Sequence, residues 1–176
     1  VRGVNKELRT SGTNAEITQS DSFTSFDSDG FTLGADSSDQ YNNTSNNYVG
    51  WSWRASGTSG SANTDGSINT TATSVNTTSG FSISTYTGTG SNATVGHGLG
   101  AVPNVVLVKR TDATSDWRMY HSGAGSGSPA TKQLFLNTTG AEDDDNTIWN
   151  DTAPTSSVFT VGTNAGSNAS GGTYVA

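Results

Sequence analysis

Hydrophobic and polar residues alternate along several short segments of this chain. In residues 48–54, "YVGWSWR", the alternation places Val49, Trp51 and Trp53 on one face. Residues 80–88 ("GFSISTYTG") and 116–122 ("DWRMYHS") follow the same pattern, and "VPNVVLVKR" contains the continuous apolar run typical of a buried strand. A period of two is that of a β-strand, and residues that favour helices are scarce. The pattern therefore predicts an all-β protein.

Polar segments divide the chain into three parts. Residues 55–80 contain almost no large apolar side chain and are predicted to be a polar linker. Residues 81–176 are predicted to form a β-sandwich, jelly-roll-like with long polar loops, and residues 1–54 a partial β unit. We expect no helix longer than about three turns after residue 80. The residues expected to be largely buried in the sandwich are Val105, Leu107, Trp117, Met119, Phe135 and Phe159.

One phrase occurs twice. Residues 31–49 read "FTLGADSSDQYNNTSNNYV", and residues 159–175 read "FTVGTNAGSNASGGTYV". A related pair, "LRTSGTNAE" and "LNTTGAE", precedes them in the same order, which favours duplication over chance similarity of polar sequence. The pairs expected to be structurally equivalent, with a two-residue difference in the loop between them, are Phe31 with Phe159, Gly34 with Gly162, and Tyr48 with Tyr174.

The two copies are unequal, which leads to a hypothesis about assembly. Residues 1–54 resemble the second half of a unit, whereas residues 81–176 lack the strand that "WSWR" supplies in the first copy. A half-sandwich exposes an apolar face and open strand edges, which recruit strands from other chains. We therefore expect Val49, Trp51 and Trp53 to form an assembly surface that completes a neighbouring copy, head to tail, by strand addition. The alternative is that further sequence on either side completes both units.

Composition and charge narrow the classes of function. Gly, Ser, Thr and Asn make up about half of the chain, and the formal net charge is −7. An acidic surface disfavours binding to nucleic acid, and no apolar segment approaches the length of a membrane span, so we expect neither partner. The chain has no Cys and two His, which excludes disulfides and leaves few ligands for zinc.

Candidate chemistry is sparse. The Gly-rich stretch "VGHGLGAVPN" precedes an apolar strand rather than a helix, so we interpret it as a tight turn with His97 in a structural role. Carboxylates could bind Ca²⁺ at two places, although neither has the spacing of a calcium loop. These metal candidates are Asp27, Asp29, Asp143, Asp144 and Asp145. No other cofactor is expected.

Exposed aromatic rings are the usual surface for stacking on sugars. Trp149 stands in the polar run "NTIWND" and is the candidate for glycan contact, although packing in the interior is the favoured interpretation. The eight Asn-x-Ser/Thr sequons, at Asn42, Asn43, Asn69, Asn76, Asn92, Asn137, Asn150 and Asn168, would suit an extracellular filament that carries glycans.

The combined order of motifs resembles the repeated β-domain of tail-fibre and appendage proteins of aquatic bacteriophages. The matching elements are "TSFDSDGFTLG", "YVGWSWR", "GFSISTYTGTG", "TVGHGLGAVPNVVLVKR", "DWRMYH", "LFLNTTGAE", "WNDTAPTSSVFTVG" and "GGTYVA". The resemblance implies a virion structural or adhesive protein, in the virion or outside the cell. The partners expected from the unequal copies and from the aromatic rings are other copies of the chain and cell-surface glycans. The alternative is a self-assembling extracellular filament subunit of a cell. A polysaccharide-degrading enzyme is disfavoured, because no convergent set of carboxylates is evident.

Overall fold

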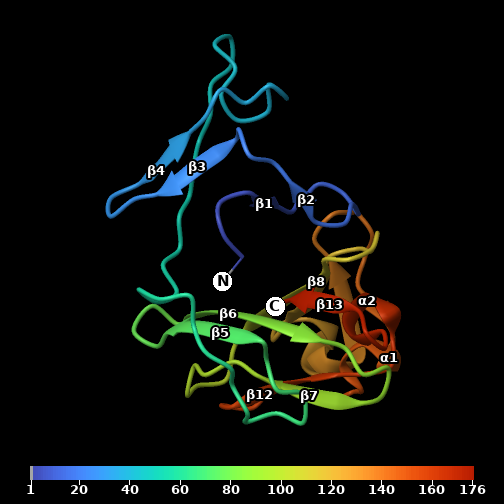
Figure 1. Ribbon diagram of the computed structural model, residues 1–176. Helices are drawn as coiled ribbons and strands as arrows, with labels where there is room; N and C mark the ends of the chain where they lie inside the picture. Colours follow the sequence, from blue (N-terminus) through green and yellow to red (C-terminus); the bar gives the residue numbers. More distant parts are fainter. Residues whose placement is uncertain (1) are drawn as a thin grey trace. The chain divides into compact units, whose positions relative to one another are not determined.

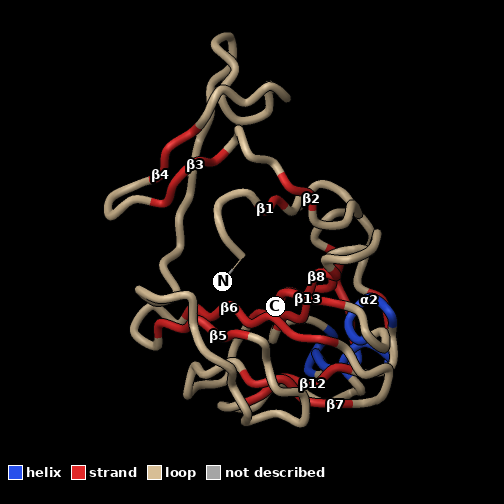
Figure 2. Tube along the Cα trace, in the orientation of Figure 1, coloured by secondary structure: helices blue, strands red, loops and turns tan. Residues whose placement is uncertain are grey.

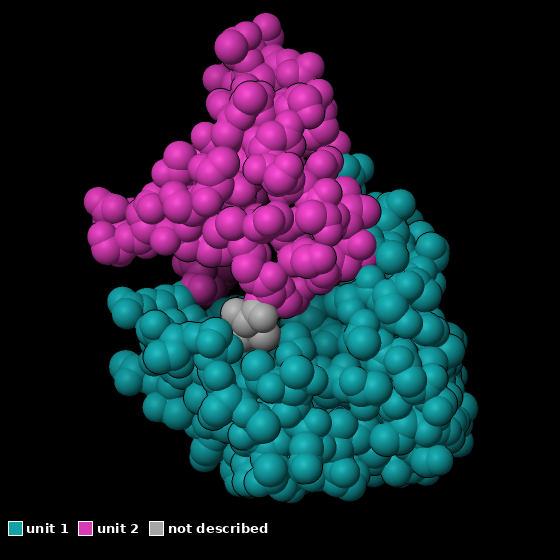
Figure 3. Space-filling model, viewed as in Figure 1, with its two compact units in different colours: residues 1, 9–15, 54–176 teal, residues 2–8, 16–53 magenta. Residues whose placement is uncertain are grey.

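The alternating segments form short antiparallel strands joined by long loops (Figures 1 and 2). The structure is a computed structural model that describes residues 2–176. It separates into two compact units (Figure 3): unit 1 contains Arg9–Ala15 and Arg54–Ala176, and unit 2 contains Arg2–Leu8 and Glu16–Trp53. The helices of the described residues are four residues long or shorter, so the predicted all-β class is confirmed.

Unit 1 is built on a seven-stranded antiparallel sheet in the order β11-β10-β9-β8-β13-β6-β5. The sheet places the last strand of the chain, β13, in its interior between β8 and β6. The bounds are β5 (Ala72–Asn76), β6 (Phe81–Thr87), β8 (Val105–Arg110), β9 (Arg118–His121), β10 (Lys132–Phe135), β11 (Asp143–Asp144) and β13 (Thr173–Val175).

A second layer covers one face of this sheet. It consists of the two-stranded sheet β7 (Ala93–Gly96) and β12 (Val158–Val161), with the short helices α1 (Asn146–Trp149) and α2 (Ala165–Asn168). Two 3-10 turns, Gly125–Gly127 and Pro129–Thr131, precede β10. The core between the layers is one cluster made mainly of Val95, Val106, Val108, Tyr86, Tyr120, Tyr174, Ile148, Trp149, Phe159 and Val161. The layers are unequal, with seven strands against two, rather than the balanced sheets of a jelly roll.

The segment predicted to be a linker belongs partly to this core. Within residues 55–80, Ala72–Asn76 forms the edge strand β5, and Ile68 is buried and bridges to Val95 of β7. Small hydroxyl side chains take the place of apolar ones: the hydroxyl groups of Thr70, Thr73 and Ser84 form a buried hydrogen-bonded chain. The linker prediction is wrong here because a strand whose contacts are mostly Ser and Thr hydrogen bonds shows no apolar alternation.

The predicted inward face of β8 is also wrong. Val106 and Val108 point into the core, whereas Val105 is 43% exposed and Leu107 is half-buried on the opposite face. Because β8 is apolar on both faces, its sequence does not show which face is inward, and an error of one residue inverts every assignment. Of the six residues expected to be largely buried, Phe159 is buried as predicted, and Trp117, Met119 and Phe135 are half-buried.

Unit 2 contains two short hairpins. β1 (Lys6–Glu7) pairs with β2 (Ile17–Thr18), and β3 (Phe23–Phe26) pairs with β4 (Phe31–Leu33). The ring of Phe23 packs against three other aromatic rings, those of Phe26, Phe31 and Tyr41, at centroid distances of 6.2, 5.2 and 5.5 Å. This aromatic cluster is the apolar centre of unit 2.

The duplicated phrase has the same local hydrogen bonding in both copies. The N–H of Gly34 donates to the carbonyl of Ser22, and the N–H of Gly162 donates to the carbonyl of Ile148. Two residues after each glycine, a second N–H donates to the carbonyl one residue before the first acceptor: Asp36 donates to Asp21, and Asn164 donates to Thr147. Two further pairs of N–H donors occupy corresponding places in the two copies: Asp39 with Ser167, and Asp27 with Thr155.

The equivalence extends to the tyrosines at the end of the phrase. The Tyr48 hydroxyl accepts from the N–H of Asn43, and the Tyr174 hydroxyl accepts from the N–H of Ala169, five residues earlier in both cases. The predicted equivalence of Gly34 with Gly162 and of Tyr48 with Tyr174 is therefore present in the hydrogen bonds. An asparagine in each loop also bonds back to the carbonyl of its glycine: Asn42 to Gly34, and Asn168 to Gly162.

The strand partners of the two copies differ. β4 pairs with the preceding strand β3, whereas β12 pairs with β7, which comes from the part of the chain before the repeat. The duplicated segment therefore keeps its own turns, and the strands around it differ between the two units.

A substitution at Gly162 tests the close packing in this segment. A Cβ on Gly162 would overlap the carbonyl oxygen of Thr147, so Gly162→Ala must displace the backbone. We expect a loss of about 2–3 kcal/mol in the free energy of unfolding, measured by urea denaturation. The control is Gly140→Ala, where a Cβ would make only an ordinary contact with the Thr138 hydroxyl. Equal stability of the two variants would contradict the packing.

Candidate functional site

The most conspicuous surface of unit 2 is a run of exposed aromatic and aliphatic side chains, residues 48–53, which we call the aromatic segment. Val49, Trp51 and Trp53 are 80%, 74% and 65% exposed. The two Trp rings meet edge to face at a centroid distance of 6.4 Å. The segment belongs to no strand of the described structure, although its sequence has the alternation of one. Exposed rings of this size are unusual on a monomer and mark interaction surfaces.

The second copy shows what the same residues do inside a sheet. Tyr174, the equivalent of Tyr48, lies in β13 between β6 and β8 and is 1% exposed, whereas Tyr48 is 47% exposed. The Tyr174 ring stacks on that of Tyr86 at a centroid distance of 5.1 Å. The aromatic segment therefore begins with residues whose counterparts form an interior strand.

A buried carboxylate organises the loop that leads to the aromatic segment. Asp36 accepts hydrogen bonds from the N–H groups of Tyr41 and Asn42 and from the hydroxyl groups of Ser22 and Ser38. The N–H of Tyr41 contributes most to lowering the pKa of Asp36 to about 2, against the effect of burial, which raises it. The equivalent residue in the second copy is Asn164, which caps α2 through the N–H of Gly166.

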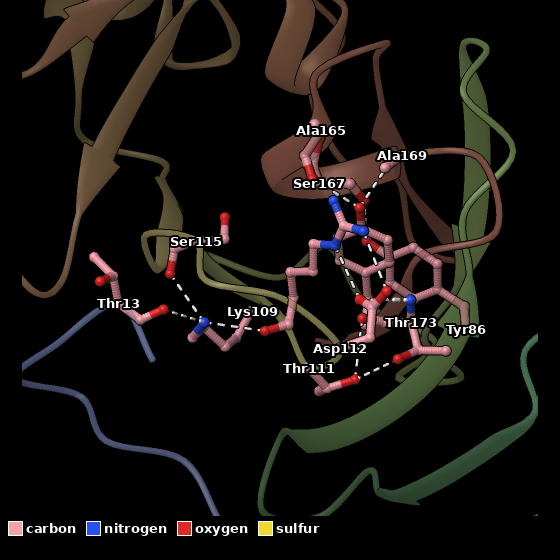
Figure 4. A network of polar contacts seen from close by, with 12 residues as sticks. Thr13, Tyr86, Lys109, Thr111, Asp112, Ser115, Ala165, Ser167, Ala169 and Thr173 are labelled. Carbon is pink, nitrogen blue, oxygen red and sulfur yellow. Dashed lines mark hydrogen bonds and ion pairs between the residues drawn. The ribbon is translucent and has the colours of Figure 1, made fainter. Parts of the chain in front are cut away.

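A buried amine holds the segment Arg9–Ala15 to the rest of unit 1. Lys109 lies on the face of β8 opposite the core, and its ammonium group donates to the carbonyls of Thr13, Arg110 and Ser115 at 3.2, 3.0 and 2.9 Å (Figure 4). Burial lowers the pKa of Lys109. Trp117 Nε1 also donates to this segment, at the carbonyl of Arg9.

A second polar network shown in Figure 4 fixes the entry to β13. Arg110 and Asp112 form a bidentate ion pair, and Asp112 also accepts from the N–H of Thr173. The Arg110 hydrogen bond contributes most to lowering the pKa of Asp112 to about 2. These contacts bind β13 to β8 and are structural in character.

The predicted metal candidates do not form a cluster. Asp143 accepts from Gln133 and Asp144 pairs with Lys132, while Asp145 caps α1 through the N–H of Thr147. In unit 2, Asp27 accepts from the Thr32 hydroxyl, and Asp29 lies in the exposed turn between β3 and β4. Across residues 2–176, no three Asp, Glu or His side chains come together in a group that could hold a metal ion. Calcium binding remains a prediction without an observation in its favour.

Trp149 is not a surface residue, so the predicted glycan contact there is wrong. It is 2% exposed and meets Tyr120 edge to face in the core, because α1 turns both Ile148 and Trp149 inward from a polar stretch of sequence. His97 is structural, as predicted: its Nδ1 accepts from the N–H of Leu99, and its Nε2 contacts the carbonyl of Thr155.

The fold and this surface define an all-β protein with a duplicated segment and an exposed aromatic strand sequence. The chain belongs to the family described as a domain of unknown function, DUF7483, whose model matches residues 1–176. No curated protein and no solved structure matches it. Within the described residues, no helix is long and apolar enough to cross a bilayer.

Sequence reasoning missed Asp36 and Lys109. Asp36 stands in a run of Ser, Asp and Asn where each polar residue looks alike, and the signal available was its position two residues after the repeated glycine. Lys109 follows an apolar run and precedes Arg110, and two adjacent cations are also the pattern of an exposed strand end. Its burial depends on a segment almost a hundred residues away.

The low pKa of Asp36 predicts a pH-dependent loop. Because the folded-state pKa of about 2 lies below the ordinary value of 3.8, the stabilisation is present above about pH 4 and is lost as the pH falls through about 2. We expect Asp36→Asn to increase amide hydrogen exchange at residues 41–43 at neutral pH and to remove the wild-type change between pH 4 and pH 2. Identical exchange profiles in the two proteins would contradict this role.

The Lys109 contacts predict a specific loss on substitution. Lys109→Met removes three hydrogen bonds to half-buried carbonyls, so we expect about 2 kcal/mol lower stability and faster proteolysis after Arg9. The control is Lys132→Met, which removes a surface ion pair with Asp144 and is expected to cost less than about 1 kcal/mol. Unchanged cleavage at Arg9 in Lys109→Met would show that the ammonium group does not hold this segment.

Proposed function

We propose that this protein is a structural subunit of a virion appendage, such as a tail fibre, which builds a fibre or presents a receptor-binding surface. The observation that carries the proposal is the aromatic segment, an exposed strand-like sequence on a duplicated β scaffold. The sequence resemblance to phage tail-fibre and appendage repeats points to the same class. The proposed role is mechanical and adhesive, not enzymatic, and uses no cofactor.

The physical features of the chain suit a subunit that works outside the cell. Its strands are held by backbone ladders and by many Ser, Thr and Asn side-chain hydrogen bonds, such as those of Asn168 to the carbonyls of Ser91 and Gly162. Without Cys, its stability does not depend on redox conditions. Its acidic surface disfavours nucleic acid as a partner and does not oppose neutral cell-surface glycans.

The paired rings of Trp51 and Trp53 also favour a contact with glycans. Ring faces that are mostly exposed can stack on the C–H surfaces of sugars, and here they lie outside the packed interior that contains Trp149. Glycan contact would therefore use the aromatic segment, and the same surface would serve adhesion or assembly.

The alternative, an extracellular filament subunit of a cell that carries glycans, uses the same exposed segment. The sequons do not all support glycosylation, because Asn168 is fully buried and its amide bonds to two carbonyls. Most of the other sequons, Asn42, Asn69, Asn92 and Asn150 among them, are exposed.

Localisation separates these proposals. Antibodies raised against the full chain would be applied, with gold labelling and electron microscopy, to purified virions and to surface filaments of uninfected host cells. The proposed function predicts label at defined places on virions. Label along continuous filaments of uninfected cells would overturn the proposal in favour of the cellular filament, and label confined to the cytosol would overturn both.

A further inference from the structure

The hairpin formed by β1 and β2 recurs as the hairpin formed by β10 and β11. Residues 8–16, "LRTSGTNAE", lie between the paired strands of the first and are called the first hairpin loop. Residues 134–142, "LFLNTTGAE", take the same place in the other and are called the second hairpin loop. Counterparts are 126 positions apart: Lys6 pairs with Thr18 and Lys132 with Asp144, and the N–H groups of Gln19 and Asp145 donate to the carbonyls of Asn5 and Thr131.

The two loops are equal in length and fit one shape. Gly12 and Asn14 of the first loop correspond to Thr138 and Gly140 of the second, so the glycine and the larger residue have changed places. A Cβ on Gly12 would lie 3.2 Å from Asn14 Oδ1, and a Cβ on Gly140 would lie 3.5 Å from Thr138 Oγ1. Each loop therefore accommodates a side chain at one of the two positions by having glycine at the other.

The first hairpin loop is held by the face of β8 opposite the core. The Thr13 carbonyl accepts from the Lys109 ammonium group at 3.2 Å and from the N–H of Ser115 at 2.9 Å (Figure 4). We call Lys109 and Ser115 the Lys109 cradle. A buried ammonium group is costly unless its hydrogens are paired, so the cradle needs a carbonyl in this place.

The second hairpin loop has the same residues but a different environment. Thr139 is the counterpart of Thr13, and within the described residues its carbonyl accepts no hydrogen bond. The remaining identical residues near the end of the loop show the same contrast. Thr13, Ala15 and Glu16 are half-buried, whereas their counterparts Thr139, Ala141 and Glu142 are exposed.

We propose that the second hairpin loop binds the Lys109 cradle of a second copy of unit 1, with the Thr139 carbonyl in the place that Thr13 occupies here. The inference rests on the proposed function and deepens it, since it names the contact that joins successive units of the fibre. Because one copy supplies the loop and the other supplies the cradle, the contact is head to tail and can repeat along an assembly.

The cradle recognises backbone rather than side chains. Both of its hydrogen bonds to the first loop end at one carbonyl, so the differences between the loops at other positions do not prevent binding. The Trp117 contact with the Arg9 carbonyl is not carried over, because the counterpart of Arg9 is Phe135, which lies in β10.

The spacing along the chain identifies the copy that can accept the loop. The first hairpin loop already fills the cradle of its own chain, so the acceptor is a different copy. Thr13 precedes Lys109 by 96 positions. A copy of unit 1 placed one period of 126 positions further along would have its lysine 96 positions after Thr139, and the chain would span the contact as it does in the first copy.

A loop exchange within the natural chain tests whether the second loop fits the cradle. Residues 8–16 of the full chain are replaced by "LFLNTTGAE", and the control variant carries nine Gly and Ser residues there. Because the N–H of Ser115 donates to the loop, its amide hydrogen exchange, measured by NMR, reports binding. We expect protection at Ser115 to match that of the natural chain in the exchange variant and to be roughly tenfold lower in the control. Equal protection in the two variants would overturn the proposal.

An extended protein tests the contact between copies. Residues 51–176 are appended after Ala176, so that the sequence continues at its own period. Since the chain has no Cys, Ala141→Cys in the first copy alone provides a single thiol. We expect this thiol to react roughly tenfold more slowly with a thiol reagent than it does in the natural chain, at about the rate of Ala15→Cys there. Thr64→Cys, an exposed site on a turn of the second layer, should react equally fast in both proteins.

A substitution in the cradle identifies what covers the loop. Lys109→Met in the appended copy alone should restore the fast reaction, whereas the control Lys132→Met in that copy should not. Fast reaction of Ala141→Cys in an extended protein whose appended copy unfolds cooperatively would overturn the proposal, as would slow reaction that Lys109→Met leaves unchanged. If the appended copy does not fold, the loop exchange decides.

These outcomes do not depend on localisation, because both experiments use purified protein. Binding of the loop without label on virions contradicts only the proposed function. Label on virions without binding of the loop contradicts only this inference.

Discussion

A strand inside a sheet needs a hydrogen-bonding neighbour on each side, and this constraint governs the whole molecule. β13 meets it, because β6 and β8 lie on its two sides and the Arg110–Asp112 pair fixes its start. Its counterpart in unit 2 does not, and the residues that would continue it, Trp51 and Trp53, are exposed. The difference between the two copies is thus a difference in strand partners, while the local turns are the same.

The polar composition has a structural use. A core with few aliphatic residues is supplemented by hydrogen-bonded hydroxyl groups, as in the Thr73–Ser84 contact, and by amides such as that of Asn168. Each buried polar group costs free energy unless it is paired, so this interior depends on register as much as on packing.

The sequence predicted the parts of this fold that depend on repetition and alternation. The all-β class and the equivalence of Gly34 with Gly162 came from the sequence pattern. The inward face of β8 could not be predicted because Val105, Val106 and Leu107 are all apolar. Strand β5 was missed because its neighbours in sequence are polar, and Lys109 because its partner Thr13 is distant in the chain. For Trp149 the polar neighbours left both glycan contact and packing open, and the structure shows packing.

The central claim is that the duplicated segment has the same turns in both copies and differs in its strand partners. Amide hydrogen exchange of the unmodified protein tests it most directly. The account predicts protection at Gly34 and at Gly162, whose N–H groups are hydrogen-bonded in the same way, together with strong protection at Tyr174 and fast exchange at residues 49–53. Equal protection at Tyr174 and along residues 49–53, or fast exchange at only one of the two glycines, would contradict it.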